Sequence, residues 1–143
     1  MTHLHHVDYF VVHAAATTPS MNIGVAEIRE WHLARGWDDV GYHLVIRRSG
    51  VVEYGRNFST RGAHTRGYNS KSLGICLVGG LDSEGLAENN FTEEQFDTLE
   101  QVLKGLHVLF PLATVKGHRD FPDVTKECPC FDVEAWRKGR NIW

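Results

Sequence analysis

Apolar runs of strand length recur along the chain and are separated by polar segments. The segment from Val7 to Val12 is apolar except at Asp8, which is typical of a strand buried on both faces of a sheet. A second buried strand is predicted from Gly74 to Val78, and a shorter one from Ala113 to Lys116. Between the first two, Leu44 to Arg48 and Val51 to Gly55 flank a Ser-Gly pair, a pattern that predicts a β-hairpin.

Helical spacing of apolar residues is found first between about Val25 and Arg35. Asn22 is a candidate N-cap for this helix, and Gly36 is a candidate stop. The predicted buried face of the helix consists of Val25, Ile28 and Trp31.

The clearest helix signal begins at Thr92, where Gln95 completes a capping box and Phe91 with Phe96 forms a hydrophobic staple. Its apolar stripe consists of Phe96, Leu99, Val102, Leu103, Leu106 and Phe110. A last helix is predicted from Asp132 to Lys138. Because strands alternate with helices, we predict one α/β domain over residues 1–143, with a central mixed β-sheet flanked by helices on both faces.

Composition narrows the range of partners. Apolar residues make up 42% of the chain and charged residues 23%, which is ordinary for a globular protein. The net charge of −3 gives no electrostatic basis for binding nucleic acid or an anionic membrane. Residues 1–6 lack the cationic and apolar segments of a secretory signal, so we expect a protein that is made and kept in the cytoplasm. Separately, we expect the protein to be a monomer.

Two histidines and a cysteine offer the imidazole nitrogen and thiolate sulfur that zinc accepts. His13 follows the first apolar run, His118 follows the strand near residue 116, and Cys128 lies in a Cys-Pro-Cys segment. A catalytic zinc site typically has three protein ligands and a water whose pKa falls to about 7. Spacing alone leaves another interpretation open, namely a strand-end histidine, a loop histidine and an unrelated thiol.

Six short motifs surround these residues in one consistent order. They are VHAAAT at 12–17, DVGYH at 39–43, GAHTRGYN at 62–69, GICLVG at 74–79, GHRD at 117–120 and KECP at 126–129. Together they resemble the zinc-dependent N-acetylmuramoyl-L-alanine amidases, the family that includes the amidase-type lysozymes of T-seven-like phages and the peptidoglycan recognition proteins. The resemblance extends from about Tyr9 to Trp136.

This resemblance implies an enzyme that hydrolyses the amide bond between N-acetylmuramic acid and L-alanine in peptidoglycan. It implies one zinc ion per chain, bound by His13, His118 and Cys128. It makes Tyr42 the catalytic tyrosine and Lys126 the cation that stabilises the oxyanion. The plainer interpretations are a core or rim aromatic for Tyr42 and a solvated surface charge for Lys126.

Other polar residues receive more modest assignments. By the resemblance His64 lines the substrate cleft and Asn69 is a second substrate contact, whereas the plainer interpretation is a solvated loop. His43 follows Tyr42 in an extended segment, so it points to the opposite side and is expected to be structural or to support the site. Cys76 is expected to be a core thiol and Cys130 a packed one. His3, His5 and His6 receive no functional role, because chain termini fray.

Three other functions remain open. The chain could be a non-catalytic peptidoglycan-binding protein of the same fold, or Cys128 with a histidine could be a thiol nucleophile that survives metal removal. A third role, inhibition of a phage RNA polymerase, involves the amino-terminal segment in T-seven-like phages, and residues 1–7 here show no matching motif. A phage endolysin acting in host lysis would be made in the host cytoplasm and would reach the cell wall through holin-type membrane lesions.

Overall fold

One five-stranded sheet organises the protein, for which a computed structural model describes residues 6–143. The strands are β1 (Tyr9–Ala14), β2 (Leu44–Ile46), β3 (Val52–Tyr54), β4 (Ser72–Leu77) and β5 (Thr114–Gly117), and their order across the sheet is β3-β2-β4-β1-β5. The β2–β3 hairpin is antiparallel, whereas β1 pairs in parallel with both β4 and β5, and β2 pairs in parallel with β4. The predicted mixed sheet is confirmed.

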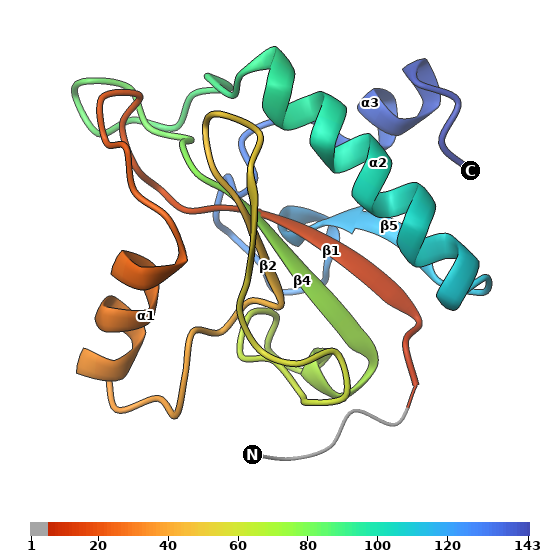
Figure 1. Ribbon diagram of the computed structural model, residues 1–143. Coiled ribbons are helices and arrows are strands. Elements are labelled where there is room, and N and C mark those ends of the chain that lie inside the picture. Colours follow the sequence, from red (N-terminus) through yellow and green to blue (C-terminus); the bar gives the residue numbers. More distant parts are fainter. Residues whose placement is uncertain (1–5) are drawn as a thin grey trace.

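The helices cover the two faces of the sheet unequally (Figure 1). Helices α2 (Glu93–Leu109) and α3 (Val133–Gly139) lie together on one face, where they pack on the larger apolar core. Helix α1 (Val25–Ala34) lies apart from them, and its Ile28 packs with Val45 and Cys76 on the other face. Alternation along β1 explains the division, because Phe10 and Val12 enter the larger core while His13 points to the opposite side.

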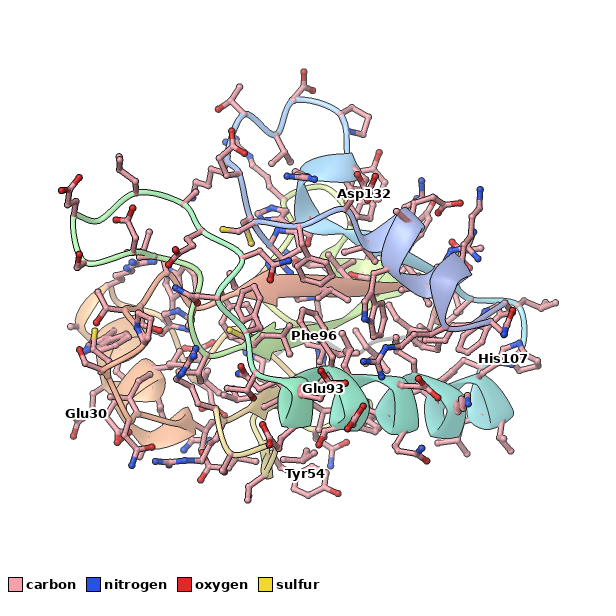
Figure 2. All side chains as sticks on the ribbon, turned by 90° about the horizontal axis from the view of Figure 1, so that it is seen from above. Glu30, Tyr54, Glu93, Phe96, His107 and Asp132 are labelled. Carbon is pink, nitrogen blue, oxygen red and sulfur yellow. The ribbon has the colours of Figure 1, made fainter. Side chains whose placement is uncertain are left out.

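The predicted start of α2 is confirmed in detail. Thr92 Oγ1 accepts a hydrogen bond from the Gln95 backbone nitrogen at 3.1 Å, and Gln95 Oε1 accepts one from the Thr92 nitrogen at 2.9 Å. The Phe91 and Phe96 rings are in edge contact, and Phe96 points from α2 toward the sheet (Figure 2). The amide of the buried Gln95 also donates to the Ile46 and Val78 carbonyls, which attaches the helix to the carboxyl ends of β2 and β4.

Three local predictions were wrong. β1 begins at Tyr9 rather than Val7, since pairing with β4 and β5 starts at Tyr9 and continues with β4 to Ala14. Asn22 does not cap α1; Gly24 occupies the N-cap position, and Glu53 Oε1 accepts from the Val25 nitrogen at 2.9 Å. Trp31 is 39% exposed rather than buried.

The end of α1 agrees with the prediction made from the sequence. Gly36 ends the α1 segment with a φ of +88°, a conformation that favours glycine. His3 and His5 lie outside the described residues, and His6 lies 3.5 Å from Asp8 at the surface. None of the helices within residues 6–143 combines the length and the apolar character needed to cross a membrane.

Candidate metal centre

Three segments that are distant in sequence bring His13, His118 and Cys128 together. His13 is the penultimate residue of β1, His118 follows the neighbouring strand β5 directly, and Cys128 comes from the loop that leads to α3. Because β1 and β5 are parallel, their carboxyl ends meet at the same edge of the sheet. One ligand atom from each of the three residues lies within 4.8 Å of the other two.

Backbone hydrogen bonds hold this arrangement in place. Asp120 Oδ2 accepts from the Gly117 nitrogen at 2.8 Å and fixes the turn that carries His118. The Arg119 nitrogen donates to the Cys128 carbonyl at 2.9 Å, which ties the two ligand-bearing segments together. The Ala14 nitrogen donates to Cys128 Sγ at 3.2 Å, a contact that stabilises a thiolate.

The donor set fits a zinc ion. His13 Nδ1 lies 3.8 Å from Cys128 Sγ. Tetrahedral zinc with its usual Zn–N and Zn–S bond lengths separates such a pair by about 3.6 Å. Within residues 6–143 no other group of three or more histidine, cysteine or acidic side chains comes as close together. The side chains that the resemblance assigned as ligands are therefore the ones that this fold brings into ligand distance.

Burial sets the protonation of the three side chains. Burial lowers the pKa of His13 well below 6.5, and the charges of His64, His118 and Lys126 lower it further. Burial likewise lowers the pKa of His118, and the charge of Lys126 lowers it further. Neutral imidazole is the form that ligates metal. Burial also raises the pKa of Cys128 to about 11, so in the absence of a cation the thiol stays protonated. Reactive cysteines have lowered pKa values, so this environment disfavours the thiol-nucleophile alternative.

Tyr42 lies beside the first ligand. Its ring centroid is 5.1 Å from that of His13, and it lies two residues before the start of β2. Burial, followed by the nearby thiols of Cys76 and Cys128, raises the pKa of Tyr42 well above its usual range. The phenol therefore keeps its proton at neutral pH and can serve as a hydrogen-bond donor.

A groove in two adjoining parts passes the three ligands. The smaller part, of about 250 Å³, is lined by all three ligands and Tyr42. The larger part, of about 510 Å³, is lined by the loop of residues 63–69 and by residues 123–126. Both parts share Trp37, Ala63, His64, His118 and Lys126, so Lys126 stands where the two join. A polymeric substrate can therefore pass the ligands while an exposed ammonium faces it.

His64 and Asn69 line the larger part, but their side chains bind other protein groups. His64 Nδ1 lies 2.9 Å from His13 Nε2, and burial lowers the pKa of His64 well below its ordinary value. Asn69 Oδ1 accepts from the backbone nitrogens of His64 and Thr65, both at 2.9 Å. A role of either residue in substrate contact stays a prediction, whereas a role in shaping the loop is directly visible.

The smaller part of the groove contains residues to which sequence reasoning gave no site role. The larger polar and aromatic ones among them are Trp31, His32, Arg35 and Trp37. His32 is buried and its Nδ1 accepts from the Gly41 nitrogen at 2.8 Å, which joins α1 to the segment carrying Tyr42. The i, i+4 spacing of Ile28 and His32 is the signal that could have placed His32, rather than Trp31, on the inner face.

Three further predictions concern neighbouring residues. His43 is fully buried; its Nε2 lies 2.7 Å from the Thr60 carbonyl, and its Nδ1 accepts from the Gly74 nitrogen, so its structural role is confirmed. Cys76 is a fully buried core thiol, as predicted. Cys130 is half-buried and donates to the Gly80 carbonyl at 3.3 Å, which fits the predicted packed thiol.

Known proteins resemble this chain over nearly its whole length. A family model described as N-acetylmuramoyl-L-alanine amidase matches residues 3–131. The endolysin of Enterobacteria phage K11 is 47% identical over 133 residues, which cover 93% of this chain and 87% of that protein. The endolysin of Escherichia phage T7 is 45% identical over 135 residues, covering 94% and 88% respectively. Among solved structures, the N-acetylmuramoyl-L-alanine amidase LysC from Clostridium intestinale superposes with a TM-score of 0.80 at 25% identity, covering 100% of this chain and 95% of LysC.

Proposed function

This chain belongs to the N-acetylmuramoyl-L-alanine amidase family, and we propose that its groove cleaves peptidoglycan with a zinc ion bound by His13, His118 and Cys128. The enzyme is an amidase of the phage endolysin group, and its substrate bond joins N-acetylmuramic acid to L-alanine. The observation that carries the zinc assignment is the 3.8 Å separation of His13 Nδ1 and Cys128 Sγ, with His118 in reach of both. Bound zinc would supply Lewis acidity, which acidifies a water and polarises a carbonyl.

Lys126 and Tyr42 supply the remaining polar groups of the reaction. When water attacks the lactyl carbonyl, negative charge develops on its oxygen, and the Lys126 ammonium at the junction of the groove stabilises that charge. Tyr42 remains a phenol, so it can donate a hydrogen bond to the reacting groups or a proton to the departing amine of L-alanine. His64 and Asn69 would contact the glycan or stem peptide from the larger part of the groove.

The biological setting follows from the endolysin group. The protein would act as a monomer, accumulate in the host cytoplasm during infection and reach the cell wall through holin-type membrane lesions. Its partner would be peptidoglycan alone. An additional role as inhibitor of a phage RNA polymerase is the alternative; a pull-down with that polymerase would detect it.

Cleavage of purified peptidoglycan before and after chelation tests the proposal. We expect new L-alanine amino termini without new reducing sugar ends, loss of this release with chelator, and recovery with zinc. Activity that survives thorough metal removal would overturn the zinc assignment. Binding of peptidoglycan without cleavage in every metal state would instead indicate a receptor. The catalytic roles of Tyr42 and Lys126 would then be wrong as well.

A further inference from the structure

The two ring nitrogens of His13 face different partners. Nδ1 lies 3.8 Å from Cys128 Sγ, on the side of the other ligands. Nε2 lies 2.9 Å from His64 Nδ1, on the side of the sheet. A neutral imidazole carries one proton, and the nitrogen that binds a metal must be the unprotonated one. The partner of Nε2 therefore decides whether Nδ1 is available to a metal.

A chain of hydrogen bonds behind His13 has only one consistent direction. It ends at the Tyr68 carbonyl, which can only accept, so the Ser72 hydroxyl donates to it at 2.8 Å. With its single proton used, Ser72 Oγ accepts from His64 Nε2 at 3.3 Å. His64 then carries its proton on Nε2 and presents a lone pair on Nδ1, which accepts from His13 Nε2. The unprotonated nitrogen of His13 is then Nδ1, the one facing Cys128.

Two glycines make the position of the His64 ring possible. A Cβ at Gly62 would lie 2.6 Å from His64 Cδ2, and a Cβ at Gly74 would lie 2.6 Å from His64 Cγ. The ring thus occupies a slot between β4 and the loop, and Asn69 fixes that loop through the backbone nitrogens of His64 and Thr65. The ring cannot shift sideways without leaving the slot.

We propose that His64 is a positioning residue, which holds His13 in the tautomer whose Nδ1 lone pair faces the metal. This inference rests on the proposed zinc site, and it gives His64 a role independent of substrate contact. Thr65 Oγ1 lies 3.0 Å from His64 Nδ1 and 3.4 Å from His13 Nε2, so it can share the His13 proton as a second acceptor. Losing the partner of a ligating histidine typically weakens metal binding by about 10–100-fold.

Two substitutions of similar shape separate hydrogen bonding from packing. In His64→Asn, the amide oxygen takes nearly the place of the ring Nδ1 and can still accept from His13. In His64→Leu, the branched side chain fills part of the slot but offers no acceptor. The zinc Kd of each protein would be measured by competition with a chromophoric chelator. We expect His64→Leu to raise the Kd by roughly 10–100-fold and His64→Asn to stay within a few-fold of the native protein.

A second readout addresses the tautomer itself. Nitrogen-15 NMR of the zinc-loaded native protein should show a proton on His13 Nε2 and none on Nδ1. Ser72→Ala removes the end of the hydrogen-bond chain and adds no atoms near the ring, so it remains informative if His64→Leu does not fold. We expect Ser72→Ala to weaken zinc binding by several-fold, with an unchanged far-UV circular dichroism spectrum.

The outcomes distinguish this inference from the proposed function. If the native protein binds zinc no more tightly than the Cys128→Ser variant does, the proposed metal site itself is wrong. Tight native binding that survives in folded His64→Leu or Ser72→Ala protein would leave the zinc site intact and overturn only the role of His64. Equal weakening by His64→Asn and His64→Leu would also overturn it, since the ring would then act through packing. An NMR spectrum that shows zinc bound to His13 Nε2 would also overturn the role of His64.

Discussion

The two faces of the central sheet differ in what they bury. The face covered by α2 and α3, here called the apolar face, is packed with side chains such as Phe10, Leu77 and Leu103. The opposite side, here called the histidine face, buries His13, His32 and His43 in hydrogen-bonded positions, with Thr65 and Ser72 beside His64. Strands β1 and β4 contribute to both faces, because successive residues alternate between them, as Phe10 and His13 of β1 do. Helix α1 and the segments next to β2 and β4 supply the other residues of the histidine face. The larger apolar cluster therefore lies on one side of the sheet, whereas the buried histidines lie on the other side with the smaller cluster of Ile28, Val45 and Cys76.

This division teaches that substitutions on the two faces should have separable consequences. Changes on the histidine face that spare its packing should affect metal binding and catalysis more than stability. Changes on the apolar face should lower the free energy of unfolding and leave the chemistry of the folded fraction intact. Four predictions test this separation, from the largest expected effect to the smallest.

The largest loss of bound zinc and of amidase activity is expected from Cys128→Ser. A serine hydroxyl is a far poorer zinc ligand than a thiolate, so bound zinc should fall well below one per chain and amidase activity should fall to background. Zinc content by mass spectrometry and release of L-alanine amino termini measure the two quantities. The apparent melting temperature of the metal-free variant should stay close to that of the metal-free native protein. Retained zinc and activity would exclude Cys128 as a ligand.

The next largest effect, a loss of kcat, is expected from Lys126→Met, which keeps much of the side-chain length and removes the ammonium. Loss of an oxyanion-stabilising donor typically lowers kcat by roughly 10²–10³-fold. Zinc content and stability should be unchanged, because the Lys126 side chain is exposed and lines the groove. Steady-state cleavage of soluble muropeptides provides kcat and KM. A variant with native kcat and a raised KM would place Lys126 in substrate binding instead.

Local signals predicted much of the apolar face and little of the histidine face. The cap at Thr92, the staple and the stripe of α2 all depend on residues within a few positions of one another, so they can be read from the chain. The approach of His13 to Cys128 joins positions 115 residues apart and depends on the order of the strands, which no local pattern encodes. Motif order supplied these residues through the family resemblance.

The errors have a similar origin. The apolar character of Val7 extended the predicted β1, but a strand begins where partners pair, and Tyr9 is the first paired residue. Glu53 caps α1 from a different part of the chain, so the cap predicted at Asn22 could not be recognised as wrong from nearby residues. The contacts of His64 with Ser72 and His13 could not be predicted either, because these residues become its neighbours only in the folded chain. The substrate contact assigned to His64 stays a prediction beside them.

On the apolar face, Leu103→Ala should cost about 2–5 kcal/mol in the free energy of unfolding. Leu103 is fully buried in the core between α2 and the sheet, so the shorter side chain leaves a cavity there. Urea titration followed by circular dichroism measures the loss. The activity per folded molecule should equal that of the native protein at a temperature where both are folded. A selective loss of kcat without loss of stability would show that the two faces are coupled.

The smallest effect is expected from the titration of His43, which should lower the free energy of unfolding little at neutral pH and more in acid. It belongs to the histidine face yet acts on stability, because burial lowers its pKa to about 4 while an unfolded chain titrates near 6.5. Between these values the unfolded state binds a proton that the folded state does not, so stability is full above pH 6.5 and falls as the pH is lowered toward 4. At pH 5 this single group should account for a loss of about 2 kcal/mol.

The matched control is His43→Asn, whose amide oxygen can still accept from the Gly74 nitrogen as Nδ1 does. This variant should be less stable than the native protein at pH 7, because it lacks the contact between Nε2 and the Thr60 carbonyl. Its stability should nevertheless decline less steeply between pH 7 and pH 5, when both proteins are compared without metal by urea titration. Burial lowers the pKa values of His13 and His64 in the same direction, so both proteins should keep a residual slope. Identical slopes would mean that His43 does not contribute to the acid sensitivity of the fold.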